Sequence, residues 1–210
     1  VPGTHQGRVV ILGGGVVGQN AAQMAVGLGA SVTIIDKSLD VLRHLDARFG
    51  PQVQTLYATQ DTIIEETLAA DLVIGAVLVP GASAPKLVTR EMVSQMKKGS
   101  VLVDVAIDQG GCFETSKPTT HAAPTYIVDG VVHYCVANMP GAVARTSAAA
   151  LNNATLPFVL QLADKGAEAA MRVDPHLLHG LNVYQGKVTN LQVSEAHGMA
   201  YSAPENIIAA

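Results

Sequence analysis

The stretch Arg8-Val-Val-Ile-Leu-Gly-Gly-Gly-Val-Val-Gly-Gln-Asn-Ala-Ala22, followed by Ser31-Val-Thr-Ile-Ile-Asp36, decides the fold. A β-branched run leads into a G-x-G-x-x-G turn, a helical pattern follows, and a second apolar run ends on an acid. A lone glycine turn is weak support for a nucleotide site. Strand, glycines, helix, strand and terminal acid within about 30 residues together predict a dinucleotide-binding unit.

Each residue type in the turn has a chemical reason. We expect Gly13 to permit the tight turn, Gly15 to let a pyrophosphate approach the backbone, and Gly18 to let the helix pack on the sheet. The helix that begins near Val16 and Val17 directs unpaired N–H groups and its positive dipole end toward the phosphates. The turn therefore predicts phosphate binding through backbone atoms.

Asp36 stands at the carboxyl end of the second predicted strand. A carboxylate there can accept both hydrogen bonds of an adenosine ribose and repels a 2′-phosphate, which favours NAD over NADP. Lys37 beside it weakens that exclusion. The alternative is a glycine-rich turn of another α/β protein with Asp36 as a solvated loop acid, but that alternative does not require an acid at this distance.

Composition excludes several classes of protein. The 210 residues are 49% hydrophobic, 14% charged and 4% aromatic, with a net charge of −4. No basic block is present, which argues against nucleic acid as a partner. No apolar run is long enough for a membrane span. Cys112 and Cys135 lack metal or redox spacing and indicate reduced thiols of a cytoplasmic protein, so no metal site is predicted. The start at Val1 without Met suggests a piece of a longer polypeptide.

Apolar runs alternate with helical patterns along the first two thirds of the chain. This alternation predicts an α/β fold, a Rossmann-type doubly wound parallel sheet. Asp61 or Thr62 is expected to cap the third helix and Thr89 the fourth. Beyond the last predicted helix only short apolar segments occur. Strands are predicted at 8–12, 32–36, 53–57, 72–78, 101–105 and 131–136, and helices at 16–29, 39–49, 61–69, 89–97 and 142–165.

In such a sheet the ligand lies along the carboxyl ends of the strands. Val77 and Leu78 follow the fourth strand and are expected to line the cofactor path. Asp104 and Asp108 follow the fifth, and an acid in an apolar strand is costly unless it is hydrogen-bonded. We expect Asp108 to be the functional acid and Asp104 to bind backbone groups.

The loop after the sixth strand offers Asn138, which could bond a ribose or a carboxamide or could simply cap a turn. Met139 and Pro140 are expected to shape an apolar wall. His121 and His133 lie nearer to this region than the other histidines, and a structural role is favoured for both. Glu114 and Lys117 are expected to be solvated loop residues.

Three motifs closely resemble the bacterial L-alanine dehydrogenase family: 13–18, 103–114 and 136–146. A more distant resemblance is to the NAD-binding component of proton-translocating transhydrogenase. The resemblance extends over the whole chain, and the second and third motifs are far more specific than the glycine turn.

The resemblance implies reversible, NAD-dependent oxidative deamination of L-alanine to pyruvate and ammonia in a homohexameric cytoplasmic enzyme of amino-acid catabolism. It also implies that Asp108 is the active-site acid that handles protons at the amino-bearing carbon. The NAD contacts that it implies are Val16, Val17, Asp36, Val77, Leu78, Val105, Ala106, Ile107, Asp108, Val136, Ala137, Asn138 and Met139.

The family places its substrate-binding Arg and Lys and its catalytic His in a preceding domain that has no counterpart here. The resemblance therefore implies an NAD-binding domain at 1–146, and a long helix and tail at 147–210 that would complete the absent substrate domain. The chain alone is expected to bind NAD but to turn over alanine weakly or not at all. Alternatives are a non-catalytic NAD(H)-binding module, as in the transhydrogenase component, and a flavin or methyl-donor protein.

Overall fold

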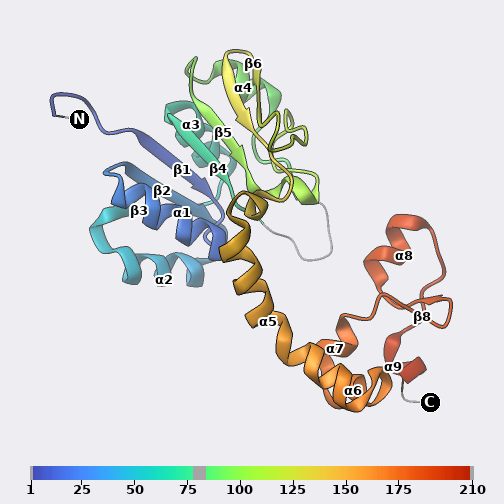
Figure 1. Cartoon of the computed structure of the whole chain (residues 1–210). Helices are drawn as coiled ribbons and strands as arrows, with labels where there is room; N and C mark the ends of the chain where they lie inside the picture. Colours follow the sequence, from blue (N-terminus) through green and yellow to red (C-terminus); the bar gives the residue numbers. More distant parts are fainter. Residues whose placement is uncertain (1, 78–83, 209–210) are drawn as a thin grey trace. The chain divides into compact units, whose positions relative to one another are not determined.

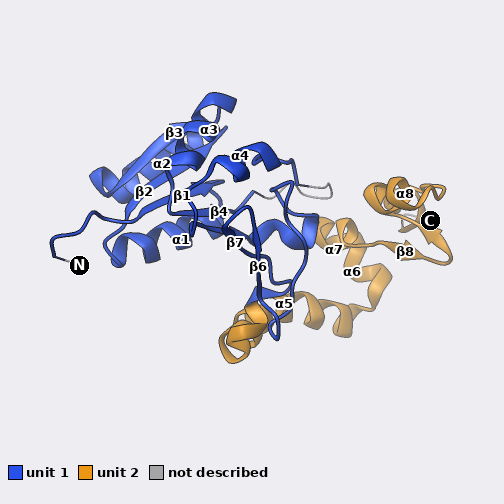
Figure 2. Ribbon diagram, turned by 90° about the horizontal axis from the view of Figure 1, so that it is seen from above, with its two compact units in different colours: residues 1–139 blue, residues 140–210 orange. Residues whose placement is uncertain are grey.

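The computed structural model describes residues 2–77 and 84–208. The chain divides into two compact units, residues 1–139 and 140–210 (Figure 2). The domain boundary predicted from the sequence, at 146/147, stays a prediction. A 3-10 turn, η3 (Met139–Val143), stands where the two units join along the chain.

The first unit is built on a seven-stranded sheet in the order β3-β2-β1-β4-β5-β7-β6 (Figure 1). All neighbouring strands run parallel except the β6–β7 pair, which is antiparallel. The doubly wound parallel sheet is therefore confirmed. The strands are β1 (Arg8–Leu12), β2 (Ser31–Asp36), β3 (Val53–Tyr57), β4 (Leu72–Gly75), β5 (Val101–Asp104), β6 (Thr125–Val128) and β7 (Val131–Tyr134).

The register brings the ends of the central strands to one line. Leu12 pairs with Ile35 on one side and with Gly75 on the other, and Gly75 pairs with Asp104. The chain order reverses between β1 and β4, because β2 and β3 lie on one side of β1 and β4 and β5 on the other. Ligands of open α/β sheets bind at such a reversal, outside the carboxyl ends of the strands.

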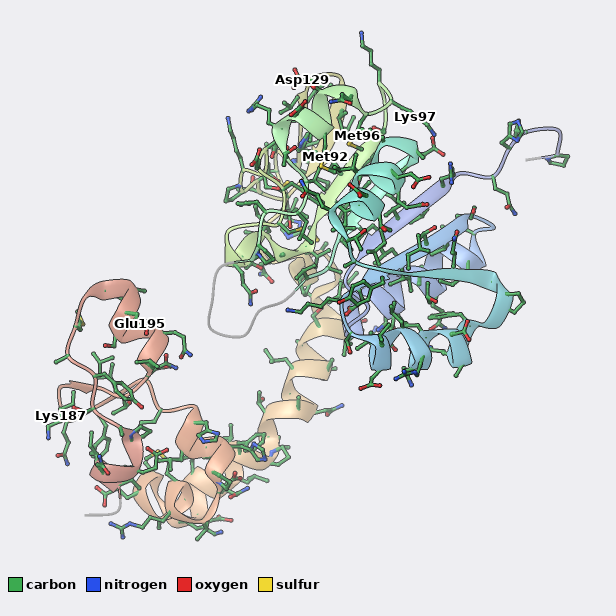
Figure 3. The ribbon with its side chains drawn as sticks, turned by 180° about the vertical axis from the view of Figure 1, so that it is seen from behind. Met92, Met96, Lys97, Asp129, Lys187 and Glu195 are labelled. Atoms are coloured by element: carbon green, nitrogen blue, oxygen red, sulfur yellow. The ribbon has the colours of Figure 1, made fainter. Side chains whose placement is uncertain are left out.

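Successive side chains of a strand point to opposite faces of the sheet, so each face has its own hydrophobic core. Val9 and Ile11 join one buried cluster with residues of α1 (Val16–Gly27) and α2 (Leu39–Phe49). Val10 and Leu12 join the other with residues of α3 (Gln60–Ala69) and α4 (Arg90–Gln95). Met92 and Met96, labelled in Figure 3, belong to this second core. Both faces are covered, as a parallel sheet requires.

Three of these helices are capped at their N-terminus by a side-chain hydroxyl. The hydroxyl of Ser38 accepts the amide of Val41, and that of Thr89 accepts the amide of Met92, so the cap predicted at Thr89 is confirmed. The cap predicted for α3 was wrong. Thr59 accepts the amide of Thr62 there, which starts the helix at Gln60.

The edge strand β6 is absent from the sequence prediction. It pairs with β7 across Asp129-Gly130, and both turn residues have positive φ angles of 51° and 82°. The predicted strands 72–78, 101–105 and 131–136 were too long, and so was the predicted helix 89–97. At 105–109 the chain leaves the sheet as a 3-10 turn, η2 (Val105–Gln109), and a shorter one, η1 (Gly50–Gln52), precedes β3.

The second unit contains more regular structure than its sequence suggested. The 22-residue helix α5 (Ala144–Lys165) contains Pro157 and has no buried residue. Ala170, Met171 and Ile208 are buried among the shorter elements that follow. These are α6 (Ala167–Val173), α7 (Pro175–His179), the hairpin β8 (Val183–Tyr184) and β9 (Lys187–Val188), α8 (Leu191–His197) and α9 (Pro204–Ile208). Over residues 2–77 and 84–208, no helix has the length and apolar character to cross a membrane.

Candidate functional site

The glycine turn lies at the reversal point of the sheet. A Cβ atom on Gly13 would lie 2.7 Å from the carbonyl oxygen of Ala76, so the loops after β1 and β4 approach closely. A Cβ atom on Gly18 would lie 1.9 Å from the carbonyl oxygen of Gly13. The close helix packing expected at Gly18 is therefore present, and both positions exclude a side chain.

The start of α1 has the properties of an anion site. Gly15 is its N-cap residue, no side chain caps the helix, and the first turn holds no acid. A Cβ atom on Gly15 would meet no atom within 4 Å, so space adjoins the backbone there. Val16 and Val17 are 79% and 45% exposed. Uncapped amides beside open space fit the pyrophosphate of a dinucleotide.

The carboxylate of Asp36 ties the second strand to this turn. Oδ2 accepts the amide of Gly14 at 2.7 Å and Oδ1 accepts the amide of Ser38 at 2.8 Å. The side chain is half-buried. Each carboxylate oxygen can accept more than one hydrogen bond. Asp36 can therefore hold its own loop and still receive ribose hydroxyls.

The loop after β4 reaches the site at Val77, which is half-buried against the second core, the one that contains Val10 and Leu12. Val77 follows Ala76, whose amide donates to the carbonyl of Leu12 at 2.8 Å. Leu78, which the sequence also assigned to the cofactor, lies outside the described residues.

The two acids after β5 have different surroundings. Asp104 is fully buried and accepts the amides of Ala106 at 3.1 Å and Cys112 at 2.9 Å, together with the hydroxyl of Ser116. Asp108 is exposed within η2. The predicted division between a structural and an accessible acid agrees with this arrangement. Only Asp108 can meet a ligand.

The remaining residues of that turn divide by burial. Val105 is half-buried, whereas Ala106 and Ile107 are buried. The carbonyls of Ala106 and Ile107 accept the amides of Gly111 and Gly110, each at 3.0 Å. Ala106 and Ile107 therefore support the turn from inside.

The loop after β7 presents one exposed amide side chain. Asn138 is exposed with a φ angle of 57°, and its carbonyl oxygen lies 3.0 Å from Nε2 of His121. Ala137 is exposed and Met139 half-buried, whereas the Val136 side chain is buried. The loop thus offers Ala137, Asn138 and Met139 to a ligand.

His133 has a structural role. Its Nδ1 lies 3.0 Å from the carbonyl of Val131, which only accepts, so Nδ1 donates and Nε2 accepts from the hydroxyl of Thr115 at 2.7 Å. Burial of the ring lowers the pKa of His133 below its ordinary value. Glu114 accepts the amide of Arg90 at 2.7 Å and so caps α4 instead of being merely solvated.

The cysteines are buried and free. Burial first, and then the nearby Asp104, raises the pKa of the Cys112 thiol far above its ordinary value, which makes it a poor nucleophile. Among the residues that the structure describes, no group of three or more His, Cys, Asp or Glu could hold a metal ion.

One residue near Asp108 was missed from the sequence. The ammonium of Lys86 donates to the carbonyls of Gly110 at 2.6 Å and Gly111 at 2.7 Å. A lone lysine after a strand gives no signal of such a contact, because the contact depends on the path of two separate loops.

Comparison with known proteins agrees with this geometry. The model of the family "Alanine dehydrogenase/PNT, C-terminal domain" matches residues 1–191. Alanine dehydrogenase from Halomonas elongata is 63% identical over 208 residues, 99% of this chain and 56% of the relative. A solved L-alanine dehydrogenase is similar at a TM-score of 0.87 and 53% identity, over 94% of this chain and 55% of that one.

A second solved structure, transhydrogenase from Sinorhizobium meliloti, is similar at a TM-score of 0.62 and 30% identity. That likeness covers 69% of this chain and 42% of that one. The chain spans about half the length of the curated relatives that it matches.

Proposed function

The chain belongs to the family of alanine dehydrogenase/PNT C-terminal domains, and we propose that it is the NAD-binding part of an enzyme that reversibly deaminates L-alanine to pyruvate and ammonia. The family resemblance inferred from the motifs is thereby confirmed. The observation that carries the proposal is the exposed Asp108 at the same sheet edge as an uncapped helix start and Asp36.

The residues present fit NAD, which would supply the acceptor for the hydride that leaves the amino-bearing carbon. The uncapped amides at Gly15, Val16 and Val17 would bind the pyrophosphate. Asp36 would accept hydrogen bonds from the adenosine ribose and disfavour a 2′-phosphate. Val77 would pack against a ring of the cofactor.

Two loops would meet the nicotinamide half. The side chain of Asn138 would donate to or accept from a ribose or the carboxamide, and Met139 would shape an apolar wall. Val105 and Asp108 lie on the adjoining turn. Ala106, Ile107 and Val136 are buried, so any contact that they make with NAD would come from backbone atoms.

Asp108 is proposed to handle protons at the amino-bearing carbon of the substrate. A general acid or base must reach the proton that it transfers, and this exposed side chain meets that condition. The substrate carbon must also be held close to the nicotinamide, which needs a clamp for its carboxylate. By the family resemblance, the Arg and Lys that form this clamp, and the catalytic His, belong to a preceding domain. That domain has no counterpart in these 210 residues.

Organisation beyond the cofactor site is inferred from the family. We propose that residues 1–146 form the NAD-binding domain and that 147–210 complete a substrate domain supplied by further sequence. The exposed apolar residues of α5, among them Leu151 and Val159, agree with a helix that is covered in the complete enzyme. A homohexamer in the cytoplasm is the assembly and location that the resemblance implies.

The alternative is a non-catalytic NAD(H)-binding module of the transhydrogenase type. It is less favoured, because the likeness to L-alanine dehydrogenase covers 94% of the chain at 53% identity, against 69% at 30% for transhydrogenase.

The test is a titration with NADH and NADPH, alone and with pyruvate plus ammonium, of the 210-residue chain and of the complete enzyme. We expect both proteins to bind NADH and only the complete enzyme to turn over. Normal turnover by the chain alone would contradict the proposed division, and tighter binding of NADPH would contradict the cofactor assignment.

A further inference from the structure

The ammonium of Lys86 is held by carbonyl oxygens. It donates to Gly110 at 2.6 Å and to Gly111 at 2.7 Å, and the carbonyl of Phe113 lies 3.4 Å away. Within residues 2–77 and 84–208, no carboxylate forms an ion pair with it. Both close hydrogen bonds of the ammonium end on the same turn, so Lys86 stabilises the conformation of that turn.

The backbone of the turn explains why a cation is needed. Gly110 and Gly111 have φ angles of 87° and 74°, and this successive left-handed pair turns two carbonyl oxygens toward one point. These carbonyls stand at the C-terminal end of η2, where carbonyl oxygens lack partners within the helix and carry partial negative charge. The ammonium offsets their mutual repulsion.

The same turn is held from its inner side by the opposite charge. The buried carboxylate of Asp104 accepts the amides of Ala106 and Cys112. The amides of Ala106 and Cys112 are therefore bound to a carboxylate, and the carbonyls of Gly110 and Gly111 to an ammonium group. Asp108 lies between these two attachment points along the chain.

Backbone pairing explains how Lys86 reaches the turn. The amide of Ala84 donates to the backbone carbonyl of Gln109 at 3.0 Å. The amide of Leu87 donates to the backbone carbonyl of Cys112 at 2.8 Å. Farther along, the amide of Glu114 donates to Val88 at 2.9 Å. The segment 84–88 thus runs beside 109–114, with Lys86 opposite the two glycines.

We propose that Lys86 is a positioning residue for the reaction: it fixes the turn that carries Asp108 and thereby sets the direction of that carboxylate. This inference rests on the proposed function, in which Asp108 handles the substrate proton. It assigns to Lys86 an effect mainly on the proton-transfer step, because Lys86 bonds Gly110 and Gly111, which are not among the proposed NAD contacts.

The first test needs no turnover. Amide hydrogen exchange is measured in the 210-residue chain for Gly110 and Gly111, whose amides close the turn. We expect Lys86→Met to accelerate exchange at both amides by at least about fivefold. Lys86→Arg should retain part of the protection, because a guanidinium also donates to carbonyls but in a fixed fork geometry.

Lys97→Met is the matched control (Figure 3). Lys97 also donates to a backbone carbonyl, that of Ala69 at 2.7 Å. It precedes β5 and so lies at the amino ends of the strands, whereas the turn that carries Asp108 lies at their carboxyl ends. This variant should leave exchange at Gly110 and Gly111 unchanged. Unchanged exchange in Lys86→Met would overturn the proposed hold on the turn, as would equal effects of the two variants.

The second test separates positioning from general stability. In the complete enzyme, Lys86→Met should lower kcat by about tenfold or more and leave KM for NADH within about twofold. A rise in KM at constant kcat would overturn the positioning role. If the unaltered enzyme does not deaminate alanine, the proposed function fails, while the exchange result still decides whether Lys86 holds the turn.

Discussion

Asp36 Oδ2 accepts the backbone amide of Gly14 at 2.7 Å, so the acid at the end of β2 is bonded directly to the glycine turn at the end of β1. The amide of Gly13 also donates to the carbonyl of Ile35 at 2.9 Å. The strand ends that would hold the pyrophosphate and the adenosine ribose are thereby joined by hydrogen bonds within the protein. The proposed ribose acceptor and the proposed phosphate site are therefore adjacent in the fold.

Substitution of Asp36 should weaken NADH binding and reduce the preference over NADPH. Asp36→Ala removes an ionised acceptor, and hydrogen bonds to charged groups contribute about 1.5–3 kcal/mol, so Kd for NADH should rise about tenfold or more. Kd for NADPH should change much less, because the repulsion of the 2′-phosphate disappears together with the ribose contact. Fluorescence titration of both cofactors measures this.

Asp40→Ala is the control for that substitution. Asp40 is exposed, lies four residues from Asp36 and pairs with Arg43 at 2.6 Å. Its loss should leave both dissociation constants unchanged. Equal losses of NADH affinity in the two variants would remove Asp36 from the ribose site.

Three glycines in and before α1 should respond differently to alanine. Gly18→Ala places a Cβ atom 1.9 Å from a backbone oxygen and should cost about 1–3 kcal/mol of stability. Gly15→Ala meets nothing within 4 Å and should fold normally but bind NADH less tightly, because the added methyl group occupies the space beside the amides.

Gly27→Ala supplies the reference, since it lies in the same helix and its Cβ atom would meet nothing within 4 Å. Helix propensity predicts a gain of about 0.5–1 kcal/mol and no change in Kd. Thermal unfolding and NADH titration of all three variants test the scheme. A Gly15→Ala protein with unchanged Kd would argue against phosphate binding at this turn.

Asp108→Asn should separate cofactor binding from chemistry. The exposed side chain is neither a cap nor a core residue. In the complete enzyme we expect Kd for NADH to stay within about twofold and kcat to fall by at least about 100-fold, the usual contribution of general acid–base catalysis. Asp61→Asn, at an exposed acid in the first turn of α3, is the control and should retain full turnover. Substantial residual kcat in Asp108→Asn would refute the assignment.

His133 makes the stability of the first unit depend on pH. Burial lowers the pKa of this imidazole in the folded state, so the unfolded chain binds a proton more readily. The free energy of unfolding should therefore fall as the pH drops through the unfolded value of about 6.5 toward the lower folded pKa. Above that window the contribution of His133 is complete.

Urea unfolding at about pH 7.5 and about pH 5.5 measures this dependence. His133→Gln should reduce the difference between the two midpoints, at some cost in stability at both. His44→Gln, at an exposed position on α2, should leave the difference as it is. An unchanged difference in His133→Gln would show that other groups set the pH dependence.

The parallel part of the sheet could be predicted because its signals are local. The run from Arg8 to Asp36 contains periodicity, glycines and a terminal acid within one unit, and β1, α1 and β2 follow it closely. The edge strand β6 was missed although Asp129-Gly130 is a typical signal for a two-residue hairpin turn. Prolines at 118 and 124 obscured the strand that precedes that turn.

The site was only partly predictable for a physical reason. Asp108 and Asp104 could be told apart, because an acid inside an apolar strand needs hydrogen-bond donors and an acid beyond it does not. The contact of Lys86 with Gly110 could not be predicted, because it depends on how the segment 84–88 runs beside 109–114. The elements that follow α5 in the second unit are short, and their apolar segments are too brief for a periodic signal.

The buried carboxylate of Asp104 has a consequence for how this protein can change over generations. Its donors come from the turn itself, and a Cβ atom on Gly111 would lie 2.6 Å from its Oδ2 atom. A substitution that removes one of these donors leaves the carboxylate buried with fewer hydrogen bonds, and this costs folding free energy whatever its effect on the chemistry. Substitutions at Asp104, Gly111 and Ser116 are therefore expected to be energetically coupled, because the three residues meet at one buried carboxylate.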